Sequence, residues 1–175
     1  MSRLKVPVGL EDHIQGSQNA PYTLVEYGDY ECPHCAAAYP VVQQIQEHFG
    51  EQLRFVFRNF PLTEIHPYAE PAAEAAEFAA TYNQFWRMHD MIFENQSALD
   101  GILYELARNL KLPISDFSHA LEQRRFSRKI EADFSGGVRS GVNGTPSFFI
   151  NGKRFDGGHD FDSLARAIEA AAVPS

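Results

Sequence analysis

Both cysteines of this 175-residue chain stand in one segment, Cys32-Pro33-His34-Cys35. With no other cysteine, the chain has no disulfide framework. A bridge that closes so short a loop adds only about 2 kcal/mol, so a structural staple explains the pair poorly. Zinc would need two more ligands at matching spacing, and covalent haem needs His directly after the second cysteine, where Ala36 stands. The remaining interpretation is a redox-active dithiol that holds no metal.

The residues around the dithiol predict a strand, a turn and a helix. Residues 23–27 read as a strand and residues 28–31 as a turn. After the dithiol, apolar residues recur at helical spacing up to Gly50. A helix that begins here, with Pro33 in its first turn, points its unpaired N–H groups and positive dipole end at Cys32, which favours a thiolate. Cys35 lies one turn along, on the inner face and within bridging distance.

Two titratable residues accompany the dithiol. His34 lies between the sulfurs, where its imidazole can stabilise the Cys32 thiolate; the alternative is an exposed turn residue. Glu26 falls in a strand expected to be mostly buried, where an unpaired carboxylate is costly. It is expected either to relay a proton to or from Cys35 or to point into solvent at a strand edge. Pro40 is expected to bend the helix.

This order of strand, Cys-Pro-His-Cys and proline-bent helix resembles the thioredoxin superfamily. The Pro-His dipeptide is that of the DsbA-like thiol–disulfide oxidoreductases, and LRFVFRNFPL (53–62), FWRMHD (85–90) and GTPSFFING (144–152) are also similar to that branch. The resemblance covers nearly the whole chain. It implies an α/β thioredoxin fold with a helical insertion domain.

The resemblance also implies a second functional site at Thr145-Pro146. In thioredoxin-fold enzymes a cis-proline loop faces the dithiol, and here its backbone would pair with an extended substrate segment. Strong oxidases of the family tend to have valine before this proline, whereas isomerases and reductases often have threonine. The dithiol and this loop therefore favour different redox directions.

The pattern along the chain agrees with such an organisation. Residues 53–60 read as a strand, with Leu53, Phe55 and Phe57 expected on its inner face. Helical patterns then cover 67–82, 85–95, 99–109, 115–123 and 126–137. We therefore expect a thioredoxin-like core at 1–62 and 141–175, and a helical insertion at 63–140.

The last part of the chain predicts a hairpin and a helix. Residues 147–150 and 153–155 read as strands joined by Asn151-Gly152, a strong hairpin signal. Asp160 is expected to cap a final amphipathic helix that carries apolar residues as far as Ala172. Four glycines form no phosphate-binding loop and are expected to loosen the join between insertion and core: Gly136, Gly137, Gly141 and Gly144.

Composition limits the partners and the location. Fifteen Lys and Arg against 23 Asp and Glu give a net charge of −8, which disfavours nucleic acid and anionic lipid. The longest apolar run, 36–42, is far shorter than the ~20 residues of a membrane span, and residues 1–10 hold no signal-peptide core. A cytoplasmic location is expected; a removed export signal would make it periplasmic.

Together these features predict a DsbA-like protein disulfide oxidoreductase. The Cys32 thiolate attacks a substrate disulfide or, as the exposed half of a Cys32–Cys35 disulfide, is attacked by a substrate thiol; Cys35 resolves the mixed disulfide. The expected partners are protein or small-molecule thiols and disulfides, glutathione among them, and no organic cofactor is needed. The substrate, redox direction, recharging partner and oligomeric state stay open.

Three alternatives remain at this stage. A glutathione-dependent transferase or isomerase can use the same scaffold, although such relatives often have serine in place of Cys32. A non-catalytic peptide-binding module would not need the cysteines. A dithiol carrier of copper or zinc would use both thiolates. Four other histidines show no ligand spacing: His66, His89, His119 and His159.

Overall fold

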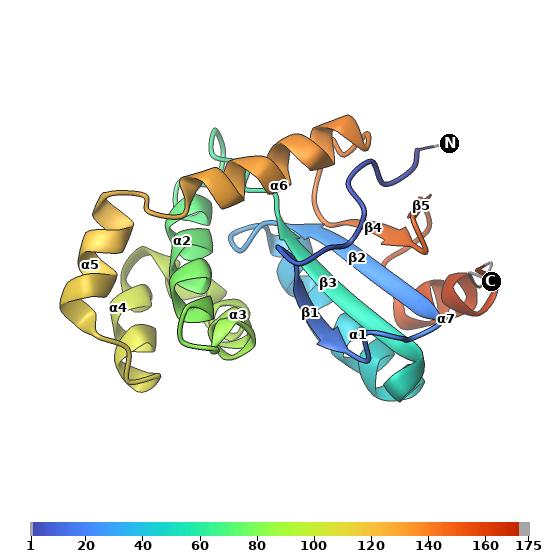
Figure 1. Ribbon diagram of the computed structural model, residues 1–175, viewed down its shortest axis with the longest axis horizontal. Coiled ribbons are helices and arrows are strands. Elements are labelled where there is room, and N and C mark those ends of the chain that lie inside the picture. Colours follow the sequence, from blue (N-terminus) through green and yellow to red (C-terminus); the bar gives the residue numbers. More distant parts are fainter. Residues whose placement is uncertain (1, 172–175) are drawn as a thin grey trace.

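The molecule has two parts that lie side by side (Figure 1). The structure is a computed structural model that describes residues 2–171. One part is a five-stranded sheet in the order β1-β3-β2-β4-β5, with α1 and α7 packed against it. The other part holds α2 to α5, and α6 runs from it back over the sheet. The observed fold is therefore α/β with a helical segment set between two strands.

The bounds of the elements are as follows. The strands are β1 (His13–Gly16), β2 (Tyr22–Gly28), β3 (Leu53–Asn59), β4 (Ser147–Ile150) and β5 (Lys153–Phe155). The helices are α1 (Pro33–Phe49), α2 (Ala69–Ala80), α3 (Phe85–Glu94), α4 (Leu99–Asn109), α5 (Ile114–Glu122), α6 (Ser127–Arg139) and α7 (Phe161–Glu169), with short 3-10 turns η1 (Gly50–Gln52) and η2 (Gln96–Ala98). No helix among residues 2–171 is long and apolar enough to cross a bilayer.

Strand β2 occupies the centre of the sheet. It pairs in parallel with β3, which requires a crossover, and α1 supplies it. On its other side it pairs antiparallel with β4, so that Glu26 lies opposite both Phe57 and Phe148. A strand in this position has neighbours on both edges. The carboxyl end of β2 leads directly into the turn that carries the dithiol.

Both faces of the sheet are covered. Leu53, Phe55 and Phe57 belong to the larger apolar cluster, which includes residues of α1, α3 and α7, so the predicted inner face of β3 is confirmed. Val56, on the opposite face, is buried as well, in a second cluster with partly buried side chains of the N-terminal segment and α6 packed against it. Strand β3 thus has no face open to solvent, because the N-terminal segment and α6 cover the side opposite to α1.

Helix α6 lies unusually close to the sheet. A Cβ on Gly137 would come within 2.8 Å of the Phe60 ring, and one on Gly136 within 3.0 Å of Val6. The expectation that these two glycines loosen the join is wrong, because they permit close packing there. Gly141, just after α6, has a φ of +89°, a conformation that glycine adopts without strain.

Most predicted elements appear, with shifts of a few residues at their ends. The expected helix at 67–82 begins at Ala69, after Pro67, and Asp160 caps α7 by accepting a hydrogen bond from the Ser163 N–H at 3.1 Å. Strand β1, antiparallel to β3, was not predicted. Ala172, expected in the last helix, lies outside the described residues. The boundaries 62/63 and 140/141 remain predictions, and residues 63–140 are called the insertion below.

Candidate functional site

The dithiol lies where the sequence predicts, at the start of α1. Cys32 is the N-cap residue with an extended backbone, and Pro33 is the first helical residue, where its missing N–H costs nothing. The Cys32 N–H donates to the Asp29 carbonyl at 3.1 Å, which closes the turn after β2. Pro40 lies inside the helix, as expected.

The two sulfurs are less accessible than the sequence suggests. Cys35 is fully buried, and Cys32 is only 4% exposed, so the expectation of an exposed attacking sulfur needs correction. Both cysteines are free thiols in this structure. Pro33 and His34 are exposed beside them. A substrate therefore meets Pro33 and His34 first and reaches only the edge of the Cys32 side chain.

The surroundings favour a thiolate at Cys32. A hydrogen bond from the Cys35 thiol lowers the pKa of Cys32 to about 5, against the opposing effect of burial. The backbone N–H groups of Cys35 and His34 act in the same direction. His34 thus contributes through its backbone, at the helix N-terminus, while its side chain is exposed.

The second sulfur is held as a thiol. Burial raises the pKa of Cys35 well above its ordinary value, and the hydrogen bond to Cys32 and the charge of Glu26 add to this. The Asp29 N–H donates to its sulfur at 3.5 Å, which acts in the opposite direction. The two thiols therefore differ strongly in acidity, and only Cys32 is charged near neutral pH.

Glu26 is buried beneath the dithiol. It is 3% exposed in the central strand, so the alternative of a strand-edge residue pointing into solvent is wrong. Burial raises the pKa of Glu26 to about 8, and the negative charge of Cys32 contributes. The side chain also lines a small cavity of about 50 Å³ that it shares with Tyr39, His89 and Asp90. A volume of that size has room for a water molecule.

The Thr145-Pro146 loop faces Cys32. The peptide bond between these residues is cis, and the Cys32 sulfur lies 3.6 Å from the Thr145 carbonyl oxygen. The Thr145 hydroxyl is buried and has no hydrogen-bond partner among the described residues. Loop and dithiol, 113 residues apart in sequence, thus share one site.

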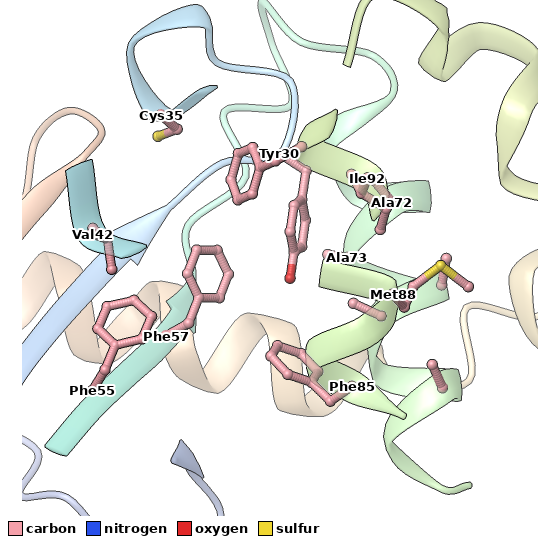
Figure 2. Close-up of a cluster of buried hydrophobic side chains, with 14 of the residues drawn as sticks. Tyr30, Cys35, Val42, Phe55, Phe57, Ala72, Ala73, Phe85, Met88 and Ile92 are labelled. Atoms are coloured by element: carbon pink, nitrogen blue, oxygen red, sulfur yellow. The ribbon is translucent and has the colours of Figure 1, made fainter. Parts of the chain in front are cut away.

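Several residues of the site were missed by the sequence analysis. Tyr30 stands between Phe57 of β3 and the side chains of α2 and α3, as Figure 2 shows, and its hydroxyl shares a hydrogen bond of 2.9 Å with His89 Nδ1. Gln96 donates to the backbone carbonyls of Tyr30 and Cys32 in residues 29–32, which are called the dithiol turn below. The FWRMHD segment, which includes His89, was the only signal of this connection in the sequence.

The remaining histidines are dispersed. His66 Nδ1 donates to the Asp29 carboxylate at 2.8 Å, and His159 lies edge-on to the Phe148 ring. His119 lies on α5, far along the insertion. Across residues 2–171, no three His, Cys, Asp or Glu side chains are grouped so that they would hold a metal ion.

Comparison with known proteins identifies the family and the fold. A family model described as thioredoxin matches residues 10–170. The structure of BdbD from Bacillus subtilis is 26% identical, with a TM-score of 0.81 over 91% of each chain. The α-DsbA1 of Wolbachia pipientis is 22% identical, with a TM-score of 0.79 over 95% of this chain and 92% of that one, and shows the fold alone. The chain belongs to the thioredoxin family.

The curated relatives are much longer proteins. The Na⁺/H⁺ antiporter NhaA 1 of Salinispora arenicola is 42% identical over 170 residues, which are 96% of this chain and 26% of the relative. The antiporter NhaA of Herminiimonas arsenicoxydans is 38% identical over 96% of this chain and 27% of its own length. The chain thus spans about a quarter of the length of the curated relatives it matches.

Proposed function

We propose that this chain exchanges disulfides through Cys32 and Cys35 by way of a mixed disulfide. The observation that carries the proposal is the split in acidity between the two sulfurs at the start of α1. The Cys32 thiolate attacks a substrate disulfide, forms the Cys32–substrate bond and releases one substrate thiolate. Cys35 then loses its proton and attacks the Cys32 sulfur, which releases the second substrate thiolate. The substrate gains two electrons and the protein becomes a disulfide; the reverse sequence oxidises a dithiol.

Glu26 takes the proton from Cys35 in this scheme. Once Cys32 is bonded to substrate, its negative charge no longer raises the pKa of Glu26, so the carboxyl releases its own proton and can then accept that of Cys35. Its negative charge raises the pKa of Cys35, and its own pKa of about 8 lies close to neutrality, where a group exchanges protons readily in both directions. The cavity beside it extends to Asp90, which hydrogen-bonds to Tyr39. Water in that cavity gives the proton a route to solvent.

The substrate segment binds along Thr145 and Pro146. The Thr145 carbonyl oxygen near the Cys32 sulfur supports this role, because a backbone acceptor there lies beside the reacting atom. An extended peptide can pair with such a backbone as an added strand, whatever its side chains. The proposed partners are accordingly protein thiols and disulfides, with glutathione as a small-molecule candidate.

Two features of the site favour opposite redox directions. A Cys32 thiolate stabilised to a pKa of about 5 favours the reduced form, which makes the disulfide form a stronger oxidant. The threonine before the cis-proline resembles isomerases and reductases of the family. A cytoplasmic location remains a prediction, and in that compartment the pair would rest reduced unless an oxidant recharges it.

Equilibration with defined glutathione buffers tests the proposal. The thiol state is read by alkylation and mass, and we expect a single two-electron transition between dithiol and disulfide. A Cys35→Ala variant should accumulate mixed disulfides with substrate, because the resolving sulfur is gone. No reversible transition in the parent, or no trapped species in the variant, would remove the proposed mechanism. Activity retained after replacement of both cysteines would favour a peptide-binding module, and stoichiometric metal in the reduced protein a metal carrier.

A second candidate function comes from the antiporter relatives. Eight of them match 94 to 96% of this chain with only 26 to 29% of their own lengths. We infer that this chain acts on thiols of such a transporter, either within one polypeptide or as a partner. Recovery of an antiporter chain as the mixed disulfide of the Cys35→Ala variant would support this role, and its absence from the trapped species in cells that express the antiporter would contradict it.

A further inference from the structure

Every residue of the dithiol turn is held by a hydrogen bond from the insertion. His66 Nδ1 donates to the Asp29 carboxylate, His89 binds the Tyr30 hydroxyl, the Tyr68 N–H donates to the Glu31 carboxylate at 2.8 Å, and Gln96 binds the backbone of Tyr30 and Cys32. The turn is therefore shared between the two parts of the molecule. Its geometry depends on side chains that come from residues 63–140.

Gln96 makes the closest connection to the reactive cysteine. Its Nε2 donates to the Cys32 carbonyl at 2.8 Å and to the Tyr30 carbonyl at 3.0 Å. Two carbonyl oxygens can be satisfied only by N–H donors, so the orientation of the amide is fixed by its partners. Gln96 opens the short η2 turn of the insertion, 64 residues from Cys32 in sequence.

The Cys32 carbonyl is the first acceptor of α1. It already receives the N–H groups of Cys35 and Ala36, both at 3.1 Å. A further N–H from Gln96 places the positive end of an amide dipole beside Cys32 and offsets the negative charge of the carbonyl oxygen. It also keeps the peptide plane in place, so that the N–H groups of His34 and Cys35 stay directed at the sulfur.

We propose that Gln96 is a positioning residue for the reaction of Cys32, acting through the two backbone carbonyls of the dithiol turn. The insertion thereby adjusts the reactivity of a cysteine that belongs to the core. This role rests on the proposed thiol–disulfide exchange, since it concerns the same sulfur.

A Gln96→Ala variant tests the proposal, with Gln84→Ala as its matched control. Gln84 is also a glutamine of the insertion whose Nε2 donates to a backbone carbonyl, that of Leu110, away from the turn. For Gln96→Ala we expect the pKa of Cys32 to rise by about half a unit, which at pH 7 is about a threefold change in the glutathione equilibrium constant toward the disulfide. Gln84→Ala should leave both quantities unchanged.

A second variant, Gln96→Glu, keeps the shape of the side chain and replaces the donor by an oxygen. Its ionised carboxylate faces two carbonyl oxygens, so its Cys32 pKa should rise at least as far as in Gln96→Ala. The pKa is read from thiolate absorbance and from the pH dependence of alkylation, neither of which needs turnover. A Cys32 pKa that moves no further in either variant than in Gln84→Ala would overturn the inference. A parent that exchanges no disulfide would instead remove the proposed function.

Discussion

Cys32 and Glu26 are two neighbouring buried acids whose pKa values are shifted in opposite directions. The hydrogen bond from the Cys35 thiol, together with the N–H groups at the start of α1, outweighs the burial of the Cys32 sulfur, so the pKa of Cys32 falls. No hydrogen bond from residues 2–171 offsets the burial of Glu26, whose pKa rises to about 8. Near pH 7 the charge therefore resides on the sulfur and the proton on the carboxyl, which is the distribution that nucleophilic attack by Cys32 requires.

Alkylation of the reduced protein should show the acidity of Cys32 directly. We expect the rate of its reaction with iodoacetamide to follow a midpoint near pH 5, because the thiolate is the nucleophile. The folded pKa lies below the ordinary 9.0, so the thiolate stabilises the reduced protein above pH 9 and loses this effect as the pH falls toward 5. In a Cys32→Ser variant, the buried Cys35 should react only slowly. A midpoint for Cys32 near 9 would contradict the assignment of the nucleophile.

Replacement of Glu26 should stabilise the folded protein and slow the resolving step of disulfide exchange. Because the folded pKa of Glu26 is raised, the parent loses stability as the pH rises from about 4.5 to 8. Glu26→Gln should therefore raise the free energy of unfolding by roughly 2 to 3 kcal/mol at pH 7, with no gain at pH 4. The resolving step should slow by about tenfold in stopped-flow decay of the mixed disulfide, since water in the cavity replaces the carboxyl only in part.

The matched control for this variant is Glu47→Gln, on the exposed side of α1. It should change neither the pH dependence of unfolding nor the rate of the resolving step. A Glu26→Gln protein whose stability follows the parent at every pH would mean that the carboxyl is not buried as an acid.

At the scale of elements, the periodicity of the sequence predicted the helices and the hairpin that depend on neighbouring residues. The helix that begins after Cys32 and the hairpin at Asn151-Gly152 follow from turn chemistry and spacing within a few residues. Strand β1 could not be predicted in this way, because His-Ile-Gln-Gly has no apolar alternation and becomes a strand by pairing with β3. The role of Gly137 was also hidden, since its contact with Phe60 joins distant segments.

The close approach of α6 to the sheet predicts a sensitive glycine. Gly137→Ala should destabilise the protein by about 1 to 3 kcal/mol in urea unfolding, because the new methyl group meets the Phe60 and Tyr27 rings at 2.8 to 3.0 Å. Gly101→Ala is the matched control in another helix, α4. It meets nothing within 4 Å and should stabilise the protein by about 0.5 to 1 kcal/mol through helix propensity. Equal effects at the two positions would show that α6 is free to move away.

At the scale of the whole molecule, one apolar cluster joins core and insertion. It contains Ile45 of α1, Phe57 of β3 and Met88 of α3 together. This contact between core and insertion also explains which site residues could be predicted from the sequence. Cys32 and Cys35 are evident from one motif, whereas the positions of His89 and Gln96 depend on how the insertion folds back over the turn. The FWRMHD segment marks His89 only by its resemblance to the family, and nothing near Gln96 in the sequence marks its contact with the turn.

The shared cluster predicts one cooperative unfolding transition for both parts. The single tryptophan, Trp86 of the insertion, packs on Phe55 of the core with ring centroids 5.6 Å apart. Its fluorescence therefore reports on the contact between the parts, while far-UV circular dichroism reports on all helices. In a thermal or urea titration the two midpoints should coincide. An earlier fluorescence midpoint would show that the insertion separates before the core unfolds.

The hydrogen bonds from residues 63–140 to the dithiol turn affect how proteins with this dithiol motif should be compared. Two chains with identical Cys-Pro-His-Cys sequences and the same cis-proline loop should differ in reduction potential wherever their helical segments present different donors to residues 29–32. A ranking of reduction potentials based only on the dipeptide between the cysteines would place such chains in the wrong order. In chimaeras that exchange residues 63–140 between homologues, the reduction potential should follow the homologue from which the segment was taken.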